Sequence, residues 1–331
     1  MSGVDNASFE EIGRVIASHE SFAVVSHLRP DGDAIGSALA LGEGLHAIGK
    51  KVEIINEDGV PDALSFLPCS GRVKRPHEVV GFRPEVAFVL DTAAFSRVGE
   101  GVAAIIQGAG TLVNIDHHVS NPGFGDLVLV DSACPATGQI VYELIRALEM
   151  PLSEAARDNL WAAISTDTGS FQYPNTTART FEIGAELIKR GVDVGAISQS
   201  LYESYPFRRI ELLRELLNVL QISAGGKVAS WTLTQEIIRR YRVEPGDSEG
   251  LIDIIRSVRG VVVAVFFEEM GEGKVRVSCR SKDPAADVGK ICQKFNGGGH
   301  RLAAGARMSG EIEEVRERFL EVVYAELEGN N

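Results

Sequence analysis

The stretch Thr111-Leu-Val-Asn-Ile-Asp-His-His118 runs from a short apolar segment directly into three residues that can bind metals or move protons. Its first five residues predict a β-strand, because β-branched and apolar side chains favour extended backbone. Asp116, His117 and His118 follow where that strand would end. In open α/β sheets the carboxyl ends of the strands are where ligands collect. We therefore expect the tripeptide to lie at a functional site.

Short apolar runs alternate with helical patterns on both sides of this stretch. Further strands are predicted at Phe22–Ser26, Val52–Ile55, Val86–Leu90 and Leu127–Val130. Helices are predicted at Ala34–Ile48, with Asp33 as its cap, at Ala136–Leu148, from Ser153 toward Ile164, and at Thr177–Arg190. Continuous apolar strands between helices indicate an α/β fold with a mainly parallel, doubly wound sheet that is covered on both faces.

The alternation stops near residue 195, and the pattern is helical as far as Gln221, with Glu211–Leu220 as an amphipathic connector. A second series of elements then begins. Its predicted strands are 228–233, 261–267, 274–280 and 302–308, and its predicted helices are 250–258, 287–295 and 312–327. We therefore predict a catalytic domain over residues 1–195, a helical linker over 196–225, and a smaller α/β substrate-binding domain over 226–331.

Imidazole and carboxylate side chains recur near the ends of the predicted elements of the first half. Besides the tripeptide, they are His27, Asp31, Asp33, Asp91 and Asp167. Taken singly, an aspartate after a strand is usually a turn former or a helix cap, and a lone histidine is usually a hydrogen-bonded, partly buried side chain. Together, these residues provide the ligands that a two-metal hydrolytic site requires.

The composition limits the classes of partner. The 331 residues carry a net charge of −13, which argues against a broad basic surface for long nucleic acid. The four cysteines are scattered and include no Cys-x-x-Cys pattern, which is typical of free thiols in a reducing compartment. The apolar runs fall far short of the roughly 20 residues that span a bilayer. We expect a soluble, cytoplasmic protein with no membrane partner.

The clusters, taken in their order along the chain, resemble the motifs of the DHH phosphoesterase superfamily, which is named for its Asp-His-His tripeptide. The four matching segments are 27–37, 89–92, 116–118 and 166–169, and the resemblance extends over nearly the whole chain. It implies two divalent metal ions with Asp91 as their bridge. The implied metal ligands are His27, Asp31, Asp33, Asp91, His117 and Asp167.

The same resemblance implies roles in catalysis for Asp91, Asp116 and His118, with His118 facing the scissile phosphate and Asp116 supporting an imidazole. Oxygen-rich ligation with about one imidazole per ion favours Mn²⁺, suits Mg²⁺ as well, and favours Zn²⁺ less. Water activated by the ions would attack phosphorus, and no covalent enzyme intermediate is expected.

The second half contains the glycine run Asn296-Gly-Gly-Gly-His-Arg301, followed by Leu302-Ala-Ala-Gly305. As an isolated feature it indicates a flexible loop, although glycines also let the backbone approach an anion closely. In this position it resembles the substrate-binding signature of the DHH-associated C-terminal domain, and residues 278–281 resemble that domain's second anion-binding segment. The implied substrate-binding residues are Arg280, Ser281, Gly297, Gly298, Gly299, His300 and Arg301. Arg208-Arg209 and Lys189-Arg190 are interpreted as ordinary helix-surface charges.

Size and architecture resemble the two-domain oligoribonucleases that also dephosphorylate 3′-phosphoadenosine 5′-phosphate (pAp). The implied substrates are short single-stranded RNA and small nucleotides, not long duplexes. A close alternative is a phosphodiesterase for cyclic dinucleotides or their linear products, which would differ in the shape of its cleft. An alternative of another class is a non-catalytic nucleotide sensor, against which the full ligand set argues. A homodimer is compatible with the sequence, which does not determine the oligomeric state.

Overall fold

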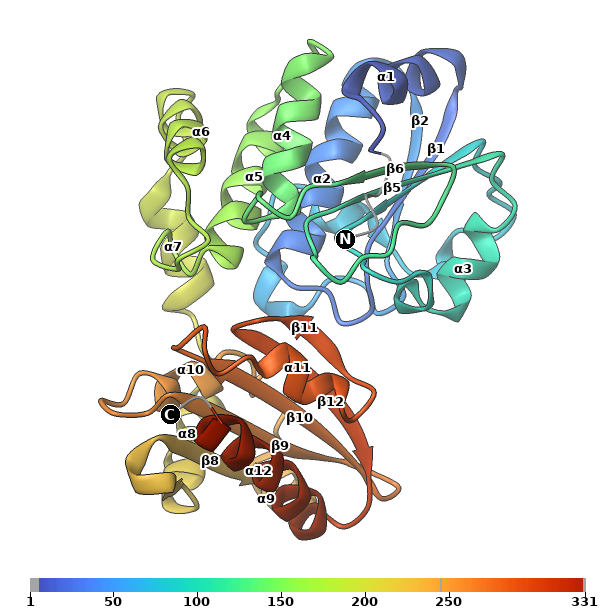
Figure 1. Cartoon of the computed structure of the whole chain (residues 1–331). Helices are drawn as coiled ribbons and strands as arrows, with labels where there is room; N and C mark the ends of the chain where they lie inside the picture. Colours follow the sequence, from blue (N-terminus) through green and yellow to red (C-terminus); the bar gives the residue numbers. More distant parts are fainter. Residues whose placement is uncertain (1–5, 245, 330–331) are drawn as a thin grey trace. The chain divides into compact units, whose positions relative to one another are not determined.

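A computed structural model describes residues 6–244 and 246–329, and the chain forms two compact units, Met1–Ser204 and Tyr205–Asn331 (Figure 1). The chain passes from one unit to the other between helices α7 (Val194–Tyr202) and α8 (Phe207–Asn218). Each unit has its own sheet and its own buried apolar core. The two units are described separately below.

The first unit is built on a six-stranded parallel sheet with the order β3-β2-β1-β4-β5-β6. Its strands are β1 (Ser21–Val25), β2 (Lys51–Ile55), β3 (Val73–Lys74), β4 (Val86–Leu90), β5 (Thr111–Asp116) and β6 (Leu127–Val130). The predicted doubly wound α/β fold is confirmed. The strand order reverses between β1 and β4, and such a switch point is where ligands bind at the carboxyl ends of the strands.

Helices cover both faces of this sheet (Figure 1). One face packs against α1 (Phe9–Ser18), α2 (Gly32–Ala47), α4 (Thr137–Ala147) and α5 (Glu154–Asp167), and the other against α3 (Glu100–Ile106). Phe22 and Val24 of β1 enter the first core, whereas Ala23 and Val25 enter the second. This alternation is the period of two that a strand imposes. Helices α6 (Ala178–Lys189) and α7 pack against α5.

Helix α2 lies almost wholly buried because its sequence is rich in glycine and alanine. A Cβ atom placed on Gly36 would lie 2.5 Å from the carbonyl oxygen of Asn159 in α5, so only glycine permits this approach. The prediction that Asp33 caps this helix is wrong. Asp31 is the N-cap and accepts a hydrogen bond from the Ala34 N–H at 3.0 Å. The Asp33 carboxylate is therefore available for another contact.

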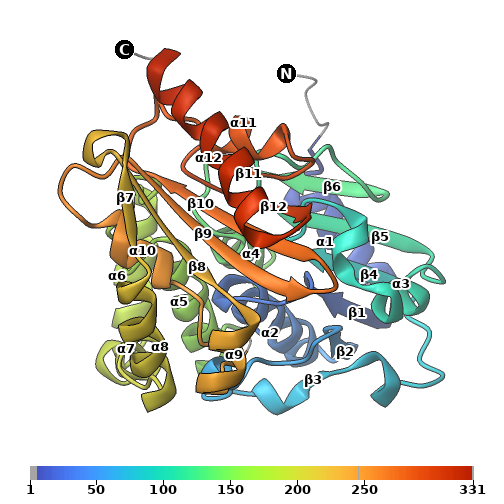
Figure 2. The same ribbon diagram turned by 90° about the horizontal axis from the view of Figure 1, so that it is seen from below.

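The second unit contains a mixed six-stranded sheet with the order β11-β12-β10-β9-β8-β7 (Figure 2). Its strands are β7 (Gln221–Ser223), β8 (Val228–Leu233), β9 (Val263–Gly271), β10 (Lys274–Ser281), β11 (Gly298–His300) and β12 (Ala303–Ser309). One core contains residues of α8, α9 (Gln235–Tyr241) and α10 (Leu251–Arg256), and the other contains residues of α11 (Val288–Gln293) and α12 (Ile312–Gly329).

Several short elements were not predicted. They are α1, α3, β3, β7 and α9, and the single-turn 3₁₀ helices Asp62–Leu64, Ser70–Arg72, Pro76–Glu78, Phe95–Val98 and Ala224–Gly226. The glycine run is also more ordered than a flexible loop, because Gly298–His300 pairs as β11 with β12. Elements of two to seven residues carry too few side chains to show a period. Helix α1 is longer, and its capping box of Ser8 and Glu11 is a sequence signal that was overlooked.

The interpretation of Arg209 as a helix-surface charge is wrong. Its side chain is only 8% exposed and its guanidinium lies 4.2 Å from the centroid of the Tyr205 ring. The guanidinium donates hydrogen bonds to the carbonyl oxygens of Asp247 at 2.7 Å and Glu249 at 2.6 Å. A buried cation needs such partners. The sequence shows a cation near the start of a helix, but not the loop that folds over it.

No described helix is long and apolar enough to span a membrane. All four cysteines are free thiols. Burial and the neighbouring Asp131 raise the pKa of Cys134 to about 12, and burial raises the pKa of Cys279 above its ordinary value. Because the thiolate is the reactive form, raised pKa values make these two cysteines weak nucleophiles at neutral pH.

Candidate metal centre

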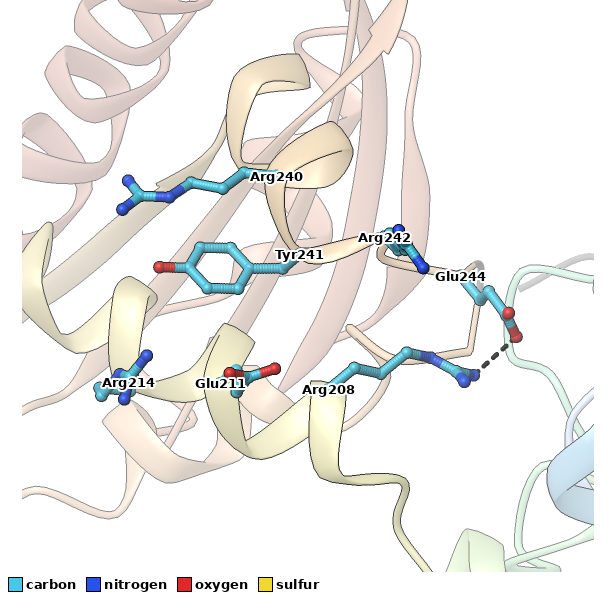
Figure 3. Close-up of a pocket in the computed structure, with 7 residues that line it drawn as sticks. All are labelled: Arg208, Glu211, Arg214, Arg240, Tyr241, Arg242 and Glu244. Carbon is cyan, nitrogen blue, oxygen red and sulfur yellow. Dashed lines mark hydrogen bonds and ion pairs between the residues drawn. The ribbon is translucent and has the colours of Figure 1, made fainter.

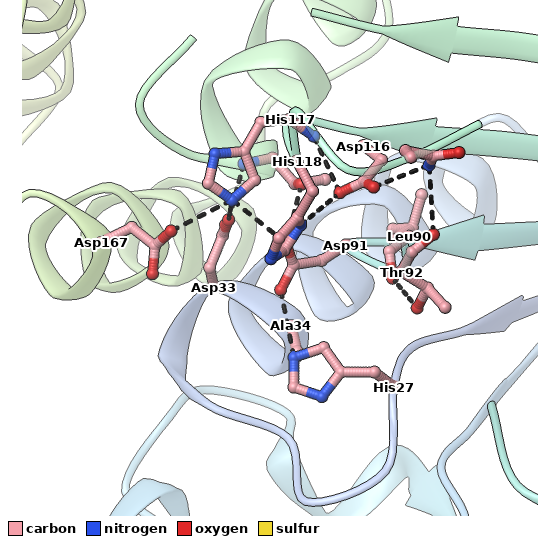
Figure 4. A network of polar contacts seen from close by, with 12 residues as sticks. His27, Asp33, Ala34, Leu90, Asp91, Thr92, Asp116, His117, His118 and Asp167 are labelled. Atoms are coloured by element: carbon pink, nitrogen blue, oxygen red, sulfur yellow. Dashed lines mark hydrogen bonds and ion pairs between the residues drawn. The ribbon is translucent and has the colours of Figure 1, made fainter. Parts of the chain in front are cut away.

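The polar residues singled out in the first half come together at the switch point of the parallel sheet (Figure 4). His27 follows β1, Asp91 follows β4, and Asp116 is the last residue of β5. Asp31 and Asp33 belong to the start of α2, and Asp167 is the last residue of α5. Residues that are far apart in sequence therefore meet because parallel strands end at the same edge.

Asp91 lies at the centre of this cluster. Its Oδ2 is 3.3 Å from Nε2 of His27, and its Oδ1 is 3.4 Å from Nε2 of His117. The Asp91 backbone has a φ of 51°, in the left-handed region that aspartate tolerates better than most residues. This turn occurs directly after β4. Each oxygen of one carboxylate thus faces a different imidazole.

The remaining ligand candidates complete a group of donor atoms around each imidazole. His27, Asp31 and Asp91 form one group, and Asp33, His117 and Asp167 form the other, with the donor atoms of each group within 4.8 Å of one another. Nε2 of His117 is 3.2 Å from Oδ2 of Asp167 and 3.9 Å from Oδ2 of Asp33. All six predicted ligands therefore lie in two adjoining groups, with Asp91 at their junction.

The carboxylates of this site perturb one another because they are close and shielded from water. Burial and the charges of Asp91 and Asp167 raise the pKa of Asp33 well above its usual range. Burial also raises the pKa of Asp167 to about 6, although the hydrogen bond with His117 opposes this shift. Burial acts in the same direction on Asp91, but contacts with His117 and His27 outweigh it and hold its pKa well below the usual range.

The imidazoles show the complementary effect. Burial alone would lower the pKa of His27, but its contacts with Asp91 and Asp31 raise it to about 9. The pKa of His117 is likewise raised well above its ordinary value by Asp167 and Asp91, which outweigh its burial. Nδ1 of His27 donates to the carbonyl oxygen of Leu28 at 2.8 Å, which directs Nε2 toward the carboxylates.

The donor set fits divalent cations. Within residues 6–244 and 246–329, no lysine or arginine nitrogen lies within 4.0 Å of the carboxylates of Asp33, Asp91 or Asp167. Among the described residues, the buried carboxylates are therefore stabilised by imidazolium protons and, at Asp33, by the N–H groups of Thr137 and Gly138. Carboxylate oxygens with a few imidazole nitrogens are ligands that Mn²⁺ accepts and that also suit Mg²⁺. A cation can replace the protons without moving the donors far.

Metal binding is therefore expected to release protons and to tighten as the pH rises. A pKa of about 9 means that His27 holds a proton at pH 7 in the metal-free protein, whereas a ligating imidazole must be neutral. The apparent Mn²⁺ affinity should increase between about pH 6 and pH 9. Calorimetric titration in buffers with different ionisation enthalpies would count the protons released. An affinity that is independent of pH over this range would contradict the expectation.

Asp116 and His118 form a separate polar chain beside the two groups. Nδ1 of His118 donates to Oδ1 of Asp116 at 2.7 Å, and the Asp116 oxygens also accept from the His117 N–H at 2.8 Å and from the Asn121 amide at 2.7 Å. Asn121 in turn donates to the side-chain oxygen of Asn114 at 2.8 Å. Asp116 is buried, and its two oxygens already accept these three hydrogen bonds, which favours support over metal ligation.

The residues at the start of α4 contact the metal-ligand candidates and were not predicted. The N–H groups of Thr137 and Gly138 donate to Oδ2 and Oδ1 of Asp33 at 2.6 and 2.8 Å. The Thr137 hydroxyl also donates to Oδ1 of Asp91 at 3.1 Å. Asp33 thus caps α4 from a different helix, where the free N–H groups and the helix dipole favour a carboxylate. One threonine orients two of the predicted ligands.

Thr137→Val is therefore expected to weaken Mn²⁺ binding about 10- to 100-fold, which is the usual effect of losing a partner that orients a ligand. Thr137→Ser is the matched control, because it retains the hydroxyl and should bind Mn²⁺ within a few fold of wild type. Titration of metal-free protein with Mn²⁺ measures both affinities. Equal affinities for the valine and serine variants would show that the hydroxyl does not matter.

Gly32, between the two aspartates of α2, has a steric role. A Cβ atom at this position would lie 2.5 Å from Cγ2 and 2.6 Å from Oγ1 of Thr166 in α5. These distances are shorter than any real Cβ contact, so a larger residue would push α2 away from α5. The glycine therefore keeps Asp31 and Asp33 on one side close to Asp167 on the other.

The glycine run of the second unit lies at the edge of its sheet. A Cβ atom on Gly297 would lie 2.2 Å from the Gly305 carbonyl oxygen, and Gly299 adopts a φ of 137°. These glycines are thus required for β11 to cross close to β12. As the last strand of the sheet, β11 has no neighbouring strand on its outer side, and Gly289 of α11 lies close to the carbonyl oxygens of Gly299 and His300. A glycine-rich edge of this kind can approach a ligand closely.

The other predicted substrate residues differ in their surroundings. Arg280 lies at the end of β10, opposite Ala303 of β12, and its guanidinium donates to the carbonyl oxygen of Cys279 at 3.1 Å. Ser281 is buried, and its hydroxyl donates to the Asp283 carbonyl oxygen at 2.9 Å, so its contacts stabilise a turn. Arg301 donates to the carbonyl oxygen of Pro284 at 2.6 Å. Its side chain remains largely exposed.

Two family models match the chain. Residues 21–165 match the DHH family, N-terminal domain, and residues 215–329 match the DHHA1 domain. These matched segments include the metal-ligand candidates His27 to Asp91 and His117, and all the substrate-binding candidates, whereas Asp167 lies two residues beyond the first.

Relatives of known name cover most of the chain. A bifunctional oligoribonuclease and PAP phosphatase NrnA from Thermus thermophilus is 35% identical over 306 residues, which are 92% of this chain and 89% of that protein. A protein of the same name from Bacillus subtilis is 29% identical over 299 residues, covering 89% and 92% of the two chains. A crystal structure of an exopolyphosphatase-related protein from Bacteroides fragilis superposes with a TM-score of 0.87, at 27% identity and with 96% and 95% of the chains covered.

Proposed function

The chain belongs to the DHH family, and we propose that it is a metal-dependent phosphoesterase that hydrolyses short oligoribonucleotides to 5′-mononucleotides and pAp to AMP. The observation that carries the proposal is the pair of donor groups that share Asp91. A site with two adjoining groups of oxygen and imidazole ligands is suited to in-line displacement at phosphorus. The Thermus and Bacillus relatives, whose names give both activities, support the choice of substrates.

In this proposal His27, Asp31 and Asp91 would hold one divalent ion, and Asp33, Asp91, His117 and Asp167 would hold the other. When bound, the ions, with Mn²⁺ favoured over Mg²⁺, would supply Lewis acidity and an activated water. Four ionised aspartates contribute −4, and two divalent ions contribute +4. The loaded site is therefore close to neutral, and the phosphate charge of a substrate requires additional hydrogen-bond donors.

His118 is the donor that the first unit provides for the substrate. Its Nδ1 is bonded to Asp116, so Nε2 is the nitrogen that would meet a phosphate oxygen or the leaving group. The contact with Asp116, together with the charge of Asp91, raises the pKa of His118 despite its burial. A protonated imidazole at this position can donate to a phosphate oxygen and supply a proton to the departing oxygen.

We propose that the second unit binds the part of the substrate that does not react. Arg280, Arg301 and the edge strand Gly298–His300 offer guanidinium and backbone groups to a second phosphate or to a nucleoside. Both pAp and a dinucleotide carry such a second polar end. The net charge of −13 disfavours long polyanions, so the expected substrates are short single strands and small nucleotides.

A kinetic assay of the Mn²⁺-loaded protein on four substrates tests the proposal. We expect turnover of a linear diribonucleotide and of pAp, each with a kcat/KM well above that for cyclic di-AMP and inorganic pyrophosphate. Turnover of cyclic di-AMP with both proposed substrates inert would overturn the assignment in favour of a cyclic dinucleotide phosphodiesterase. Tight nucleotide binding without turnover of any substrate would favour the non-catalytic sensor.

A further inference from the structure

The second unit contains a hollow lined mainly by arginines, about 710 Å³ in volume, between α8 and α9 (Figure 3). We call it the arginine hollow. It is lined by Arg208, Glu211, Arg214, Arg240, Tyr241, Arg242 and Glu244. Four cations and two carboxylates give this surface a net charge of +2, on a chain whose total charge is −13. Its volume falls within the roughly 300–1,000 Å³ of pockets that bind small molecules.

The arginines of the hollow differ in how they are paired. Arg208 contacts Asp247 at 2.7 Å and Glu244 at 2.6 Å, so its charge is already matched. Arg214, Arg240 and Arg242 are exposed, and within the described ranges 6–244 and 246–329 none of them lies within 4.0 Å of a carboxylate oxygen. Water and salt screen these exposed charges from one another, and an anion in the hollow would be attracted to all three at once. The three guanidinium groups are therefore available to an anionic ligand.

The hollow is formed by elements that the core holds in place. Leu212 and Leu216 of α8 and Ile237 of α9 are all buried in one apolar cluster. The Tyr241 hydroxyl donates to Glu215 of α8 at 3.0 Å, and the Arg240 guanidinium lies 5.4 Å from the centroid of the Tyr241 ring. The two helices are therefore tied together across the hollow. The arginines are presented from a preformed surface, which limits the entropy lost when a ligand binds.

The arginine hollow is distinct from the proposed substrate segment of the same unit. Helices α8 and α9 pack in one core of the sheet, whereas α11, which contacts β11, packs in the other. Strand β11 is separated from β8 by four steps in the strand order. At about 4.8 Å per step, the two strands lie roughly 19 Å apart. The arginine hollow therefore lies on a different part of the unit from a dinucleotide held at β11.

We propose that the arginine hollow is a second anion-binding site, which takes a multiply charged phosphate group independently of the substrate. Guanidinium groups match phosphate oxygens with paired, charge-assisted hydrogen bonds, and several of them can share one polyphosphate. Such a group is carried by a nucleoside polyphosphate or by the backbone of an RNA strand longer than the substrate. Binding at this site would make the enzyme sensitive to the concentration of nucleotide or RNA, although its substrates bind elsewhere.

Calorimetric titration of the full-length, Mn²⁺-loaded protein tests this site. The probes are a methylene-bridged ATP analogue, which resists hydrolysis, and a twelve-nucleotide RNA with uncleavable linkages. Each probe is titrated in the presence of AMP, the product of pAp hydrolysis, at a saturating concentration. The test variant combines Arg214→Gln, Arg240→Gln and Arg242→Gln. The control variant combines Arg259→Gln, Arg307→Gln and Arg318→Gln, which are exposed arginines of the same unit outside the hollow, so both lose three charges.

We expect at least one probe to bind wild type and control with equal affinity, and to bind the test variant at least tenfold more weakly. Loss for the ATP analogue identifies a free nucleotide as the source, and loss for the RNA alone identifies the strand. All three proteins should turn over pAp within twofold of one another. Equal binding by both variants, or no binding by wild type under these conditions, would overturn the proposal. The calorimetric titration measures binding without hydrolysis. A failure of the proposed phosphoesterase activity would therefore appear only in the turnover of pAp and not in this binding test.

Discussion

Asp91→Ala is expected to abolish phosphoester hydrolysis and to remove bound Mn²⁺. Asp91 faces His27 with one oxygen and His117 with the other, so its loss affects both groups of ligand candidates at once. We expect kcat/KM to fall by at least about a thousandfold, equivalent to about 4 kcal/mol of transition-state stabilisation. Elemental analysis after gel filtration should find less than one ion per chain, and kinetics on pAp should show the loss of activity.

Asp91→Asn separates the charge from the shape of the side chain, because the amide is nearly isosteric with the carboxylate. It should fold like wild type, yet lack the rise in unfolding temperature that Mn²⁺ gives to the wild-type protein by binding only its native state. Asp62→Ala, at an exposed position in the single-turn helix Asp62–Leu64, is the matched control and should retain full activity and metal. Full activity in both Asp91 variants would refute the bridging role.

His118→Asn is expected to lower kcat about 10²- to 10⁴-fold while the bound metal is retained. His118 is oriented by Asp116 through Nδ1, and its own distance to Asp91 is 3.6 Å. It can therefore act on the substrate without being needed to hold an ion. The loss should be greatest for a substrate with a poor leaving group, because protonation of the departing oxygen matters most there.

The metal content distinguishes a His118 that contacts the substrate from a His118 that binds a metal ion. Donor atoms of Asp91, Asp116, His117 and His118 lie within 4.8 Å of one another, so these four residues could themselves form a metal site. Loss of one ion in His118→Asn would make His118 a ligand and would refute the role proposed here. His77→Asn, an exposed histidine of the same unit, is the control and should change neither kcat nor metal content.

The long buried strands of the first half were the most predictable elements. Its strands Phe22–Ser26, Val86–Leu90 and Thr111–Ile115 were predicted within one residue of β1, β4 and β5, because buried parallel strands are continuous apolar runs. The resemblance to the DHH superfamily is confirmed by the match of residues 21–165. In the second half, the strand Gly298–His300 was expected to be a loop. It pairs with β12, but three residues are too few to show the alternating pattern of a strand.

The sequence by itself determined the doubly wound sheet and the set of imidazole and carboxylate side chains at its carboxyl edge. Both follow from local properties, namely the apolar period of each strand and the polar residues that come directly after it. Only the tertiary structure decided how those side chains pair. Thr137 donates to Asp33, 104 positions earlier, and to Asp91, 46 positions earlier, because α4 begins beside α2 and β4.

The burial of Arg209 and the arginine hollow were likewise decided by packing, since each depends on which helix or loop covers which face. Such contacts depend on how elements pack and not on the local sequence of any one of them. The Asp-His-His tripeptide could therefore be located from the sequence alone. The distinct tasks of Asp116, His117 and His118 became separable only when their partners were in place.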